Sequence, residues 1–378
     1  MIYLDNAATS WPKPPEVAAE VNRMLTEFGG SAGRGGHEFS LQAARRIFWT
    51  RQRLAELVGL NDPSSVVFTA NATQALNEAL FGLLKPGDHV IASSVEHNAV
   101  ARPLRVLTRR GVEVSWIPAI GEDWFSLEEY RRSFRPNTRL VVTVHASNVT
   151  GALLPVEEIG VIAREHGVPY LLDASQTAGV FDLAALPADL IAFPGHKALL
   201  GPQGTGVLVI RNKISLQPII VGGTGSMSES DEQPDFLPDA LESGTQNGPG
   251  IAGLGRGVAF IQSQGMVTLR EKEQALCQRL LDGLSEIPKV LVYGGLDARK
   301  KAPVVAFNIG DADSMLVGHI LDTAYGIISR AGLHCAPYAH RVLGTLDRGV
   351  VRFSPSHFTT VEEVDQAVGA VAEIASQV

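Results

Sequence analysis

The sequence contains 378 residues, of which 45% are hydrophobic, and its formal net charge at pH 7 is −8. This acidic balance argues against nucleic acid and anionic membrane surfaces as partners, because both bind basic faces, and no stretch reaches the ~20 consecutive apolar residues of a membrane-spanning helix. With only two cysteines, and no secretory or transit pattern at the start of the sequence, we expect no disulfide framework, no metal site and a cytoplasmic location.

Short apolar runs alternate with helix-length segments from about Ser64 onward. The runs expected to form strands are residues 66–68, 89–92, 112–117, 140–144, 168–172, 190–193 and 207–210. The segment after the first run carries apolar residues at helical spacing, from Ala75 to Leu83. This alternation favours an α/β fold with a mostly parallel central sheet and helices on both faces. Ligands of such sheets bind beyond the carboxyl ends of the strands.

The second part of the chain has a different pattern. Residues 222–250 are rich in Gly, Ser, Asp, Glu and Pro without apolar periodicity, which predicts a long loop. We expect one long helix over 251–287, then short strands at 290–293, 304–309, 327–329 and 350–353, with helices near Leu316 and after Val361. The pattern predicts a large domain of residues 15–255 and a smaller α+β domain of residues 1–14 and 256–378.

Two motifs follow predicted strands and carry chemically useful side chains. Lys197 comes just after the run 190–193 and before a glycine-rich turn at 201–206, so its amine could be held against an aldehyde. Asp173 comes directly after the run 168–172, where a carboxylate could pair with a pyridinium nitrogen, and Gln176 follows in the same turn. Each has a simpler interpretation, as a loop lysine and a helix-capping aspartate respectively.

Two further sites lie where predicted strands pass into helices. Ala72 and Thr73 occupy a helix start, whose free backbone amides and positive dipole end suit an anion. His97 lies just beyond the run 89–92 and could stack on a ring. Many helix starts bind nothing, and a histidine at such a position often has only a local structural role.

Taken together and in chain order, these motifs resemble a known family. The residues that carry the resemblance are Tyr3-Leu4-Asp5-Asn6-Ala7-Ala8-Thr9, Ala72-Thr73, His97, Asp173 with Gln176, and His196-Lys197. They are similar to class-V aminotransferase-fold enzymes, and within these to the cysteine desulfurase and selenocysteine lyase group, from residue 3 to about residue 360. The resemblance implies a fold-type I transferase that binds pyridoxal 5'-phosphate as a Schiff base on Lys197.

The resemblance also implies a role for each cofactor-binding position. Asp173 would bind the pyridine nitrogen, Gln176 the phenolic oxygen, and His97 the ring face; Ala72, Thr73 and His196 would hold the phosphate, and Asn148 would lie near the ring oxygen and the substrate carboxylate. Thr245 matches a residue that reaches the phosphate of a partner subunit, which implies a homodimer. Pro194 departs from the pattern, because relatives commonly carry a phosphate-binding serine there.

The two thiols point to the reaction. Cys277 lies on an apolar helix face and is expected in the core. Cys335 lies in an irregular segment beside His334 and near Arg330, surroundings that could favour the reactive thiolate, although a bystander loop cysteine is the alternative. The stretch resembles the compact active-cysteine loop of desulfurases, in which Arg330 also belongs to the motif.

Arg352 resembles the substrate-binding arginine of the family. A guanidinium can donate two parallel hydrogen bonds to a carboxylate, which suits the carboxylate of an α-amino acid. We therefore expect a cysteine desulfurase with Lys197, Cys335 and His97 as catalytic residues and with Arg352, Asn148 and Arg330 binding L-cysteine. Alanine would be released, and a persulfide on Cys335 would pass to an acceptor protein or thiol. L-selenocysteine is an alternative substrate, and a non-catalytic scaffold in sulfur transfer is an alternative of another class. His37 also matches a histidine near the active site, without an assigned role.

Overall fold

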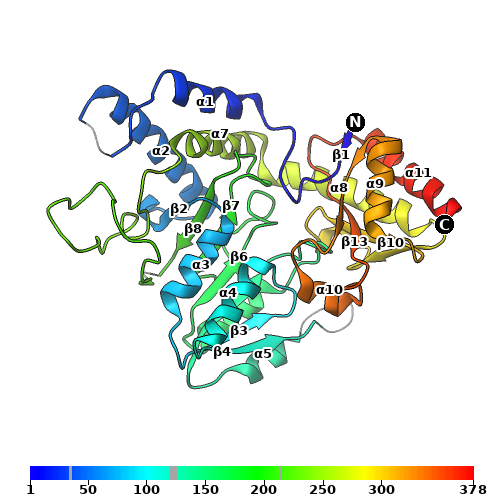
Figure 1. Cartoon of the computed structure of the whole chain (residues 1–378), viewed down its shortest axis with the longest axis horizontal. Coiled ribbons are helices and arrows are strands. Elements are labelled where there is room, and N and C mark those ends of the chain that lie inside the picture. Colours follow the sequence, from blue (N-terminus) through cyan, green and yellow to red (C-terminus); the bar gives the residue numbers. More distant parts are fainter. Residues whose placement is uncertain (34–35, 120–125, 213) are drawn as a thin grey trace.

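A seven-stranded sheet forms the centre of the computed structural model, which describes residues 1–33, 36–119, 126–212 and 214–378 (Figure 1). The strands, in spatial order, are β2 (Val66–Thr69), β8 (Gly206–Ile210), β7 (Leu190–Pro194), β6 (Tyr170–Asp173), β5 (Thr138–Val144), β3 (His89–Ser93) and β4 (Glu113–Ile117). The five strands from β7 to β4 are parallel, whereas β8 runs antiparallel to both β7 and β2. The predicted, mostly parallel sheet is confirmed.

Helices cover both faces of this sheet. They are α2 (Glu38–Leu57), α3 (Ala72–Leu83), α4 (Asn98–Arg109), α5 (Leu127–Ser133), α6 (Val156–Glu165) and α7 (Gly248–Gln264), and α1 (Pro15–Thr26) packs on α7. Alternate strand residues enter two separate cores: Leu171 packs with α3 and α4, whereas Leu172 packs with α2, α5, α6 and α7. Because both faces are buried, the strands have nearly continuous apolar sequences.

The predicted helix over residues 251–287 is wrong in one respect, because the structure divides it into α7 and α8 (Met266–Ser285). Gly265 separates them with φ of 83° and ψ of 112°, a left-handed backbone conformation that favours glycine. Helix α7 packs on the large sheet through Val258 and Ile261, whereas α8 packs in a second core through Leu280. We therefore propose the same two domains with their boundary at Gly265 rather than at residue 255.

A four-stranded antiparallel sheet organises the second core. Its strands, in spatial order, are β12 (Arg330–Gly332), β13 (Val350–Phe353), β10 (Val305–Ile309) and β9 (Val290–Tyr293), and α9 (Ser314–Tyr325) and α11 (Val361–Gln377) pack with it beside α8. Helix α10 (Pro337–Leu343) follows β12. The remaining short elements are β1 (Ile2–Tyr3), β11 (Ile327–Ile328), η1 (Pro63–Ser65) and η2 (Ala298–Lys300). Strand β1 pairs in parallel with β11, which brings the start of the chain next to its last quarter (Figure 1).

Candidate active site

A cavity of about 220 Å³ lies at the carboxyl ends of the parallel strands. The predicted site residues that line it are Ala72, Thr73, His97, Asn148, Asp173, Gln176, His196, Lys197, Arg330, Cys335 and Arg352. Residues more than 200 positions apart in the sequence thus meet in one place, where ligands of parallel sheets are expected. Ala7, Ala8, Asn71 and Ser175 also line the cavity, although sequence reasoning had given them no direct role, and so does His334, which was expected only as a basic neighbour of the thiol.

Lys197 and Asp173 lie together in the cavity, because Asp173 is the last residue of β6 and Lys197 follows the adjacent parallel strand β7. Asp173 is only 2% exposed, and its Oδ1 accepts hydrogen bonds from the Ser175 backbone N–H (2.9 Å) and the Ser175 hydroxyl. Burial raises the pKa of Asp173, whereas the hydrogen bonds from Ser175 and the positive charge of Lys197 act to lower it. Burial lowers the pKa of Lys197 to about 8, so more of its amine is neutral and nucleophilic near neutral pH.

The start of α3 forms one end of the cavity. Asn71 caps this helix, because its Oδ1 accepts the Gln74 N–H at 2.9 Å, while Gln74 Oε1 accepts the Ala70 N–H at 2.9 Å. The next two residues, Ala72 and Thr73, line the cavity. The first backbone N–H groups of a helix have no partner within the helix, so this end of the cavity suits an anion.

Two histidines that line the cavity are held neutral. Burial, followed by the charge of Lys197, lowers the pKa of both His97 and His196 to about 4. His97 Nδ1 accepts the Ala99 N–H at 3.0 Å, so this residue caps α4 while its ring still lines the cavity. His196 Nδ1 is buried and has no hydrogen-bond partner among the described residues, which leaves it free for a ligand.

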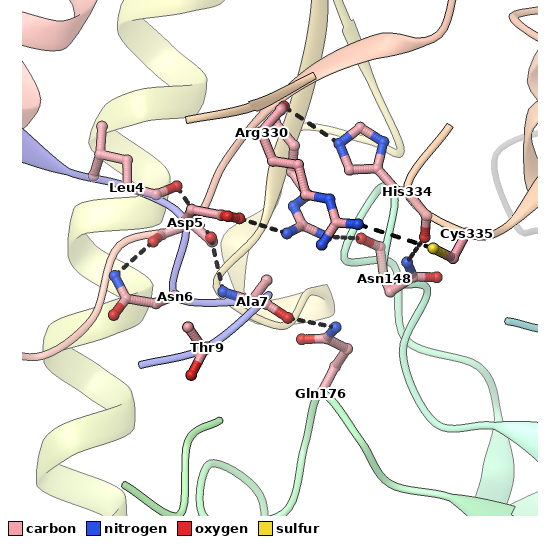
Figure 2. A network of polar contacts seen from close by, with 12 residues as sticks. Leu4, Asp5, Asn6, Ala7, Thr9, Asn148, Gln176, Arg330, His334 and Cys335 are labelled. Atoms are coloured by element: carbon pink, nitrogen blue, oxygen red, sulfur yellow. Dashed lines mark hydrogen bonds and ion pairs between the residues drawn. The ribbon is translucent and has the colours of Figure 1, made fainter. Parts of the chain in front are cut away.

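The thiol of Cys335 is exposed at the cavity, and Arg330 is its basic neighbour (Figure 2). Arg330 Nη2 donates toward the Cys335 sulfur at 3.9 Å. The expected contribution of His334 is wrong, because this side chain is 4% exposed and burial lowers its pKa to about 2. A neutral His334 cannot serve as the counter-ion of a thiolate, whereas Arg330 can.

The loop that carries Cys335 is hydrogen-bonded to segments that follow strands β5 and β3 of the large sheet. Asn148 Nδ2 donates to the His334 carbonyl at 2.7 Å, and the Asn98 N–H donates to the Cys335 carbonyl at 2.8 Å. Both His334 and Cys335 have positive φ, 50° and 57°, a conformation that costs a non-glycine residue energy. The backbone that carries the thiol is therefore held in place. The other cysteine, Cys277, is 1% exposed in the second core with its pKa raised by burial to about 11, in agreement with a packing role.

Arg352 is 1% exposed and lies opposite Arg330 in the antiparallel pair β12–β13. Its Nη1 donates to the Asn148 carbonyl at 2.8 Å, and its Nη2 donates to Asp5 Oδ1 at 2.8 Å. Sequence reasoning missed Asp5, although this residue is part of the N-terminal motif that carries the family resemblance. Burial lowers the pKa of Arg352, and Asp5 opposes this effect.

Comparison with known proteins gives the family of this chain. The family model described as aminotransferase class-V matches residues 2–367. The chain belongs to the class-V aminotransferase family. Among its curated relatives, the "probable cysteine desulfurase" of Methanothermobacter thermautotrophicus is 33% identical, over 99% of this chain and 94% of the relative. The protein named "cysteine desulfurase IscS" of Mannheimia succiniciproducens is also 33% identical, over 98% of this chain and 91% of the relative.

Solved structures of cysteine desulfurases have the same fold as this class-V aminotransferase family member. The apo structure of the cysteine desulfurase from Thermococcus onnurineus NA1 has a TM-score of 0.93 and 32% identity, and the match covers 100% of this chain and 95% of that one. The cysteine desulfurase CsdA of Escherichia coli has a TM-score of 0.88 and 27% identity, with 99% and 94% coverage. The expected fold-type I architecture is thereby confirmed.

Two residues predicted for the site of this family lie outside the cavity. Thr245 lines a separate hollow of about 600 Å³ with residues of α1 and α2. His37 caps α2 through its Nδ1, which accepts the Ser40 N–H at 3.3 Å.

Within residues 1–33, 36–119, 126–212 and 214–378, no helix is long and apolar enough to cross a membrane, and no three His, Cys, Asp or Glu side chains gather as metal ligands.

Proposed function

We propose that this protein is a pyridoxal-phosphate-dependent cysteine desulfurase. The observation that carries this proposal is the shared cavity, in which the Lys197 amine and the Asp173 carboxylate lie together with the exposed Cys335 thiol and the Arg352 guanidinium. An amine and a carboxylate suit a pyridine aldehyde cofactor, a guanidinium suits the carboxylate of an amino acid, and a thiol suits sulfur transfer. The relatives named cysteine desulfurase support the same activity.

The residues of the cavity fit the cofactor. Asn148 Oδ1 and His196 Nδ1 are buried without partners in the described chain, so polar groups there remain available to a ligand. Lys197 would hold the aldehyde carbon, Asp173 the pyridine nitrogen, Gln176 the phenolic oxygen and His97 the ring face, with the phosphate at Ala72, Thr73 and His196. When bound, the cofactor withdraws electrons from the substrate α-carbon.

Protein side chains bind the substrate, transfer its protons and accept its sulfur. Arg352 binds the substrate carboxylate, and the Lys197 amine, with a pKa of about 8, removes and returns protons at the α-carbon. The Cys335 sulfur, as a thiolate beside Arg330, attacks the substrate sulfur. A sulfur–sulfur bond forms, and the electron pair of the broken carbon–sulfur bond stays with the substrate carbon, which is protonated to give alanine. The Cys335 persulfide then passes its outer sulfur to an acceptor thiol.

Incubation of the cofactor-loaded protein with L-cysteine tests this proposal. We expect one alanine for each sulfur transferred and, without an acceptor thiol, a Cys335 peptide whose mass has increased by one sulfur atom. Release of pyruvate with an unmodified Cys335 would indicate elimination instead. A protein that binds the cofactor yet releases alanine from neither L-cysteine nor L-selenocysteine would be a non-catalytic scaffold.

We also propose that the protein is a homodimer whose active sites contain Thr245 of the partner. Thr245 shares its hollow with the apolar side chains of Leu25 and Phe48, both exposed in the single chain, a combination typical of surfaces covered by another subunit. Arg51 and Glu242 line the same hollow as a buried ion pair at 2.7 Å, which fixes the segment preceding Thr245. A partner chain would bring this threonine to a cavity that it does not reach within its own chain.

Mixing two impaired variants tests the shared site. Lys197→Ala removes the essential amine, and Thr245→Asp places a negative charge against the cofactor phosphate of the partner. In a mixed dimer one of the two sites regains both native residues, so alanine release should recover to about a quarter of the unmodified level after complete exchange. Each variant incubated alone is the control. An active protein that sediments as a monomer would contradict the proposal.

A further inference from the structure

The guanidinium of Arg352 is held by contacts on two of its nitrogens before any substrate arrives. Nη2 donates to Asp5 Oδ1 and Nη1 donates to the Asn148 carbonyl, each at 2.8 Å, while Nε is buried and has no partner among the described residues. Figure 2 shows Asp5, Asn148, Arg330 and Cys335 within one network of polar contacts. The planar guanidinium can therefore not rotate about its long side chain without breaking a charged hydrogen bond.

The charges around Arg352 explain why it needs such a partner. Arg330 stands directly opposite in the β12–β13 ladder, and like charges in that arrangement repel each other. Asp5 is the ion-pair partner of Arg352, and its side chain is 19% exposed against 2% for that of the arginine. Without an acceptor at this point, a buried guanidinium would turn toward other acceptors, away from an orientation that suits a substrate.

Asp5 itself has little freedom. It forms a parallel bridge with Ser354, its carbonyl accepts the Ala8 N–H at 3.1 Å, and the Asn6 side-chain amide donates to the Ser354 carbonyl at 2.9 Å. The same segment contacts cofactor-site residues, because the Ala7 carbonyl accepts Gln176 Nε2 at 3.2 Å. The Asp5 carboxylate is thus fixed relative to both the substrate arginine and the cofactor side of the cavity.

We propose that Asp5 is the positioning residue of the substrate-carboxylate site, holding Arg352 Nη2 so that the remaining N–H groups of the guanidinium face the incoming carboxylate. This inference rests on the proposed function, which assigns the carboxylate to Arg352. Asp5 acts as a hydrogen-bond acceptor at a fixed point, and the substrate does not touch it. The orientation of the guanidinium depends on this acceptor oxygen rather than on the negative charge, so an amide oxygen at the same place should preserve most of it.

Binding of L-alanine to the cofactor-loaded protein tests the role of Asp5 without requiring turnover. The dissociation constant is measured from the change in cofactor absorbance, and ethylamine serves as a ligand with an amine but no carboxylate. Asp5→Ala should weaken L-alanine binding by about tenfold or more, because the guanidinium loses its fixed orientation, whereas Asp5→Asn should stay within about threefold of the parent. Ethylamine binding should change in neither variant.

The controls separate this inference from the function on which it rests. The Asp322→Ala variant, which changes an exposed aspartate on α9, should bind both ligands as the parent does. The Arg352→Gln variant should bind L-alanine weakly. If Asp5→Ala does not fold, Asp5→Ser provides the same truncation. Parent-like L-alanine binding by the truncated variant, an equal loss in Asp5→Asn, or an equal loss of ethylamine binding would each overturn the role of Asp5. A parent protein without any absorbance response to L-alanine would instead contradict the proposed function.

Discussion

Replacing Cys335 by serine should reduce alanine release from L-cysteine by at least about a thousandfold while leaving cofactor and substrate binding intact. Lys197, Asp173 and Arg352 do not depend on the thiol for their own contacts, so the absorbance change on adding L-cysteine should persist. Cleavage of the carbon–sulfur bond needs a nucleophile for sulfur, and a serine hydroxyl cannot replace the thiolate beside Arg330. Alanine release and absorbance are measured on the same samples.

Cys277→Ser is the matched control, because it removes the other cysteine from a buried position in the second core. It should lower thermal stability and leave the rate of alanine release nearly unchanged. Assays of Cys335→Ser on L-selenocysteine address the alternative substrate, since selenium can leave without attack by the thiol. Near-normal alanine release from L-cysteine by the Cys335 variant would contradict the persulfide mechanism.

Removal of the Lys197 amine should have an effect of comparable size. Lys197→Ala should lower alanine release by about ten-thousandfold, because proton transfer at the α-carbon loses its base, and the cofactor should become dialysable. In the unmodified protein, burial gives Lys197 a pKa of about 8 instead of the usual 10.5. Only the neutral amine attacks an aldehyde, so covalent uptake of the cofactor should accelerate about tenfold per pH unit below pH 8 and level off above it.

Borohydride reduction followed by peptide mapping is the measurement for this lysine. The reduced cofactor should be found on Lys197. Lys13 provides a matched comparison, since burial also lowers its pKa to about 8 while its ammonium donates to Ser10 Oγ at 2.9 Å. Lys13→Ala should leave the label on Lys197. A label on Lys13 would show that low pKa, without the geometry of the cavity, determines the attachment, and a label distributed over several lysines would contradict a specific site at Lys197.

Much of the fold follows from local sequence patterns. The run 190–193 became β7 (Leu190–Pro194) and the run 207–210 became β8 (Gly206–Ile210), because strands buried on both faces are continuous in apolar residues. The division between α7 and α8 could not be predicted, since an isolated glycine such as Gly265 is tolerated within many helices and the apolar pattern continues beyond it. The break depends on α7 and α8 packing in different cores, which is a tertiary effect.

For the candidate site, the sequence indicated some residues and gave no sign of others. Residues that follow strands, such as Asp173 and Lys197, could be found because parallel strands bring their carboxyl ends together. Sequence neighbours suggested both His334 and Arg330 as basic groups near the thiol, and only the fold shows that the His334 ring is buried and neutral while Arg330 lies beside the sulfur. The contact of Asp5 with Arg352 spans 347 positions, and no local pattern indicates such a pairing.

The long-range pairing of Asp5 has a consequence for biosynthesis. The residues of this chain that we propose to bind the cofactor, from Ala72 to Lys197, emerge from the ribosome well before Arg352. At about 5–20 residues per second, the N-terminal segment waits roughly 20–70 s for its partner strand to be made. Contacts between such distant positions also form late in refolding, because closing the intervening loop costs entropy. The nascent chain can therefore assemble the residues that it supplies to its own cofactor site before its site for the amino acid exists.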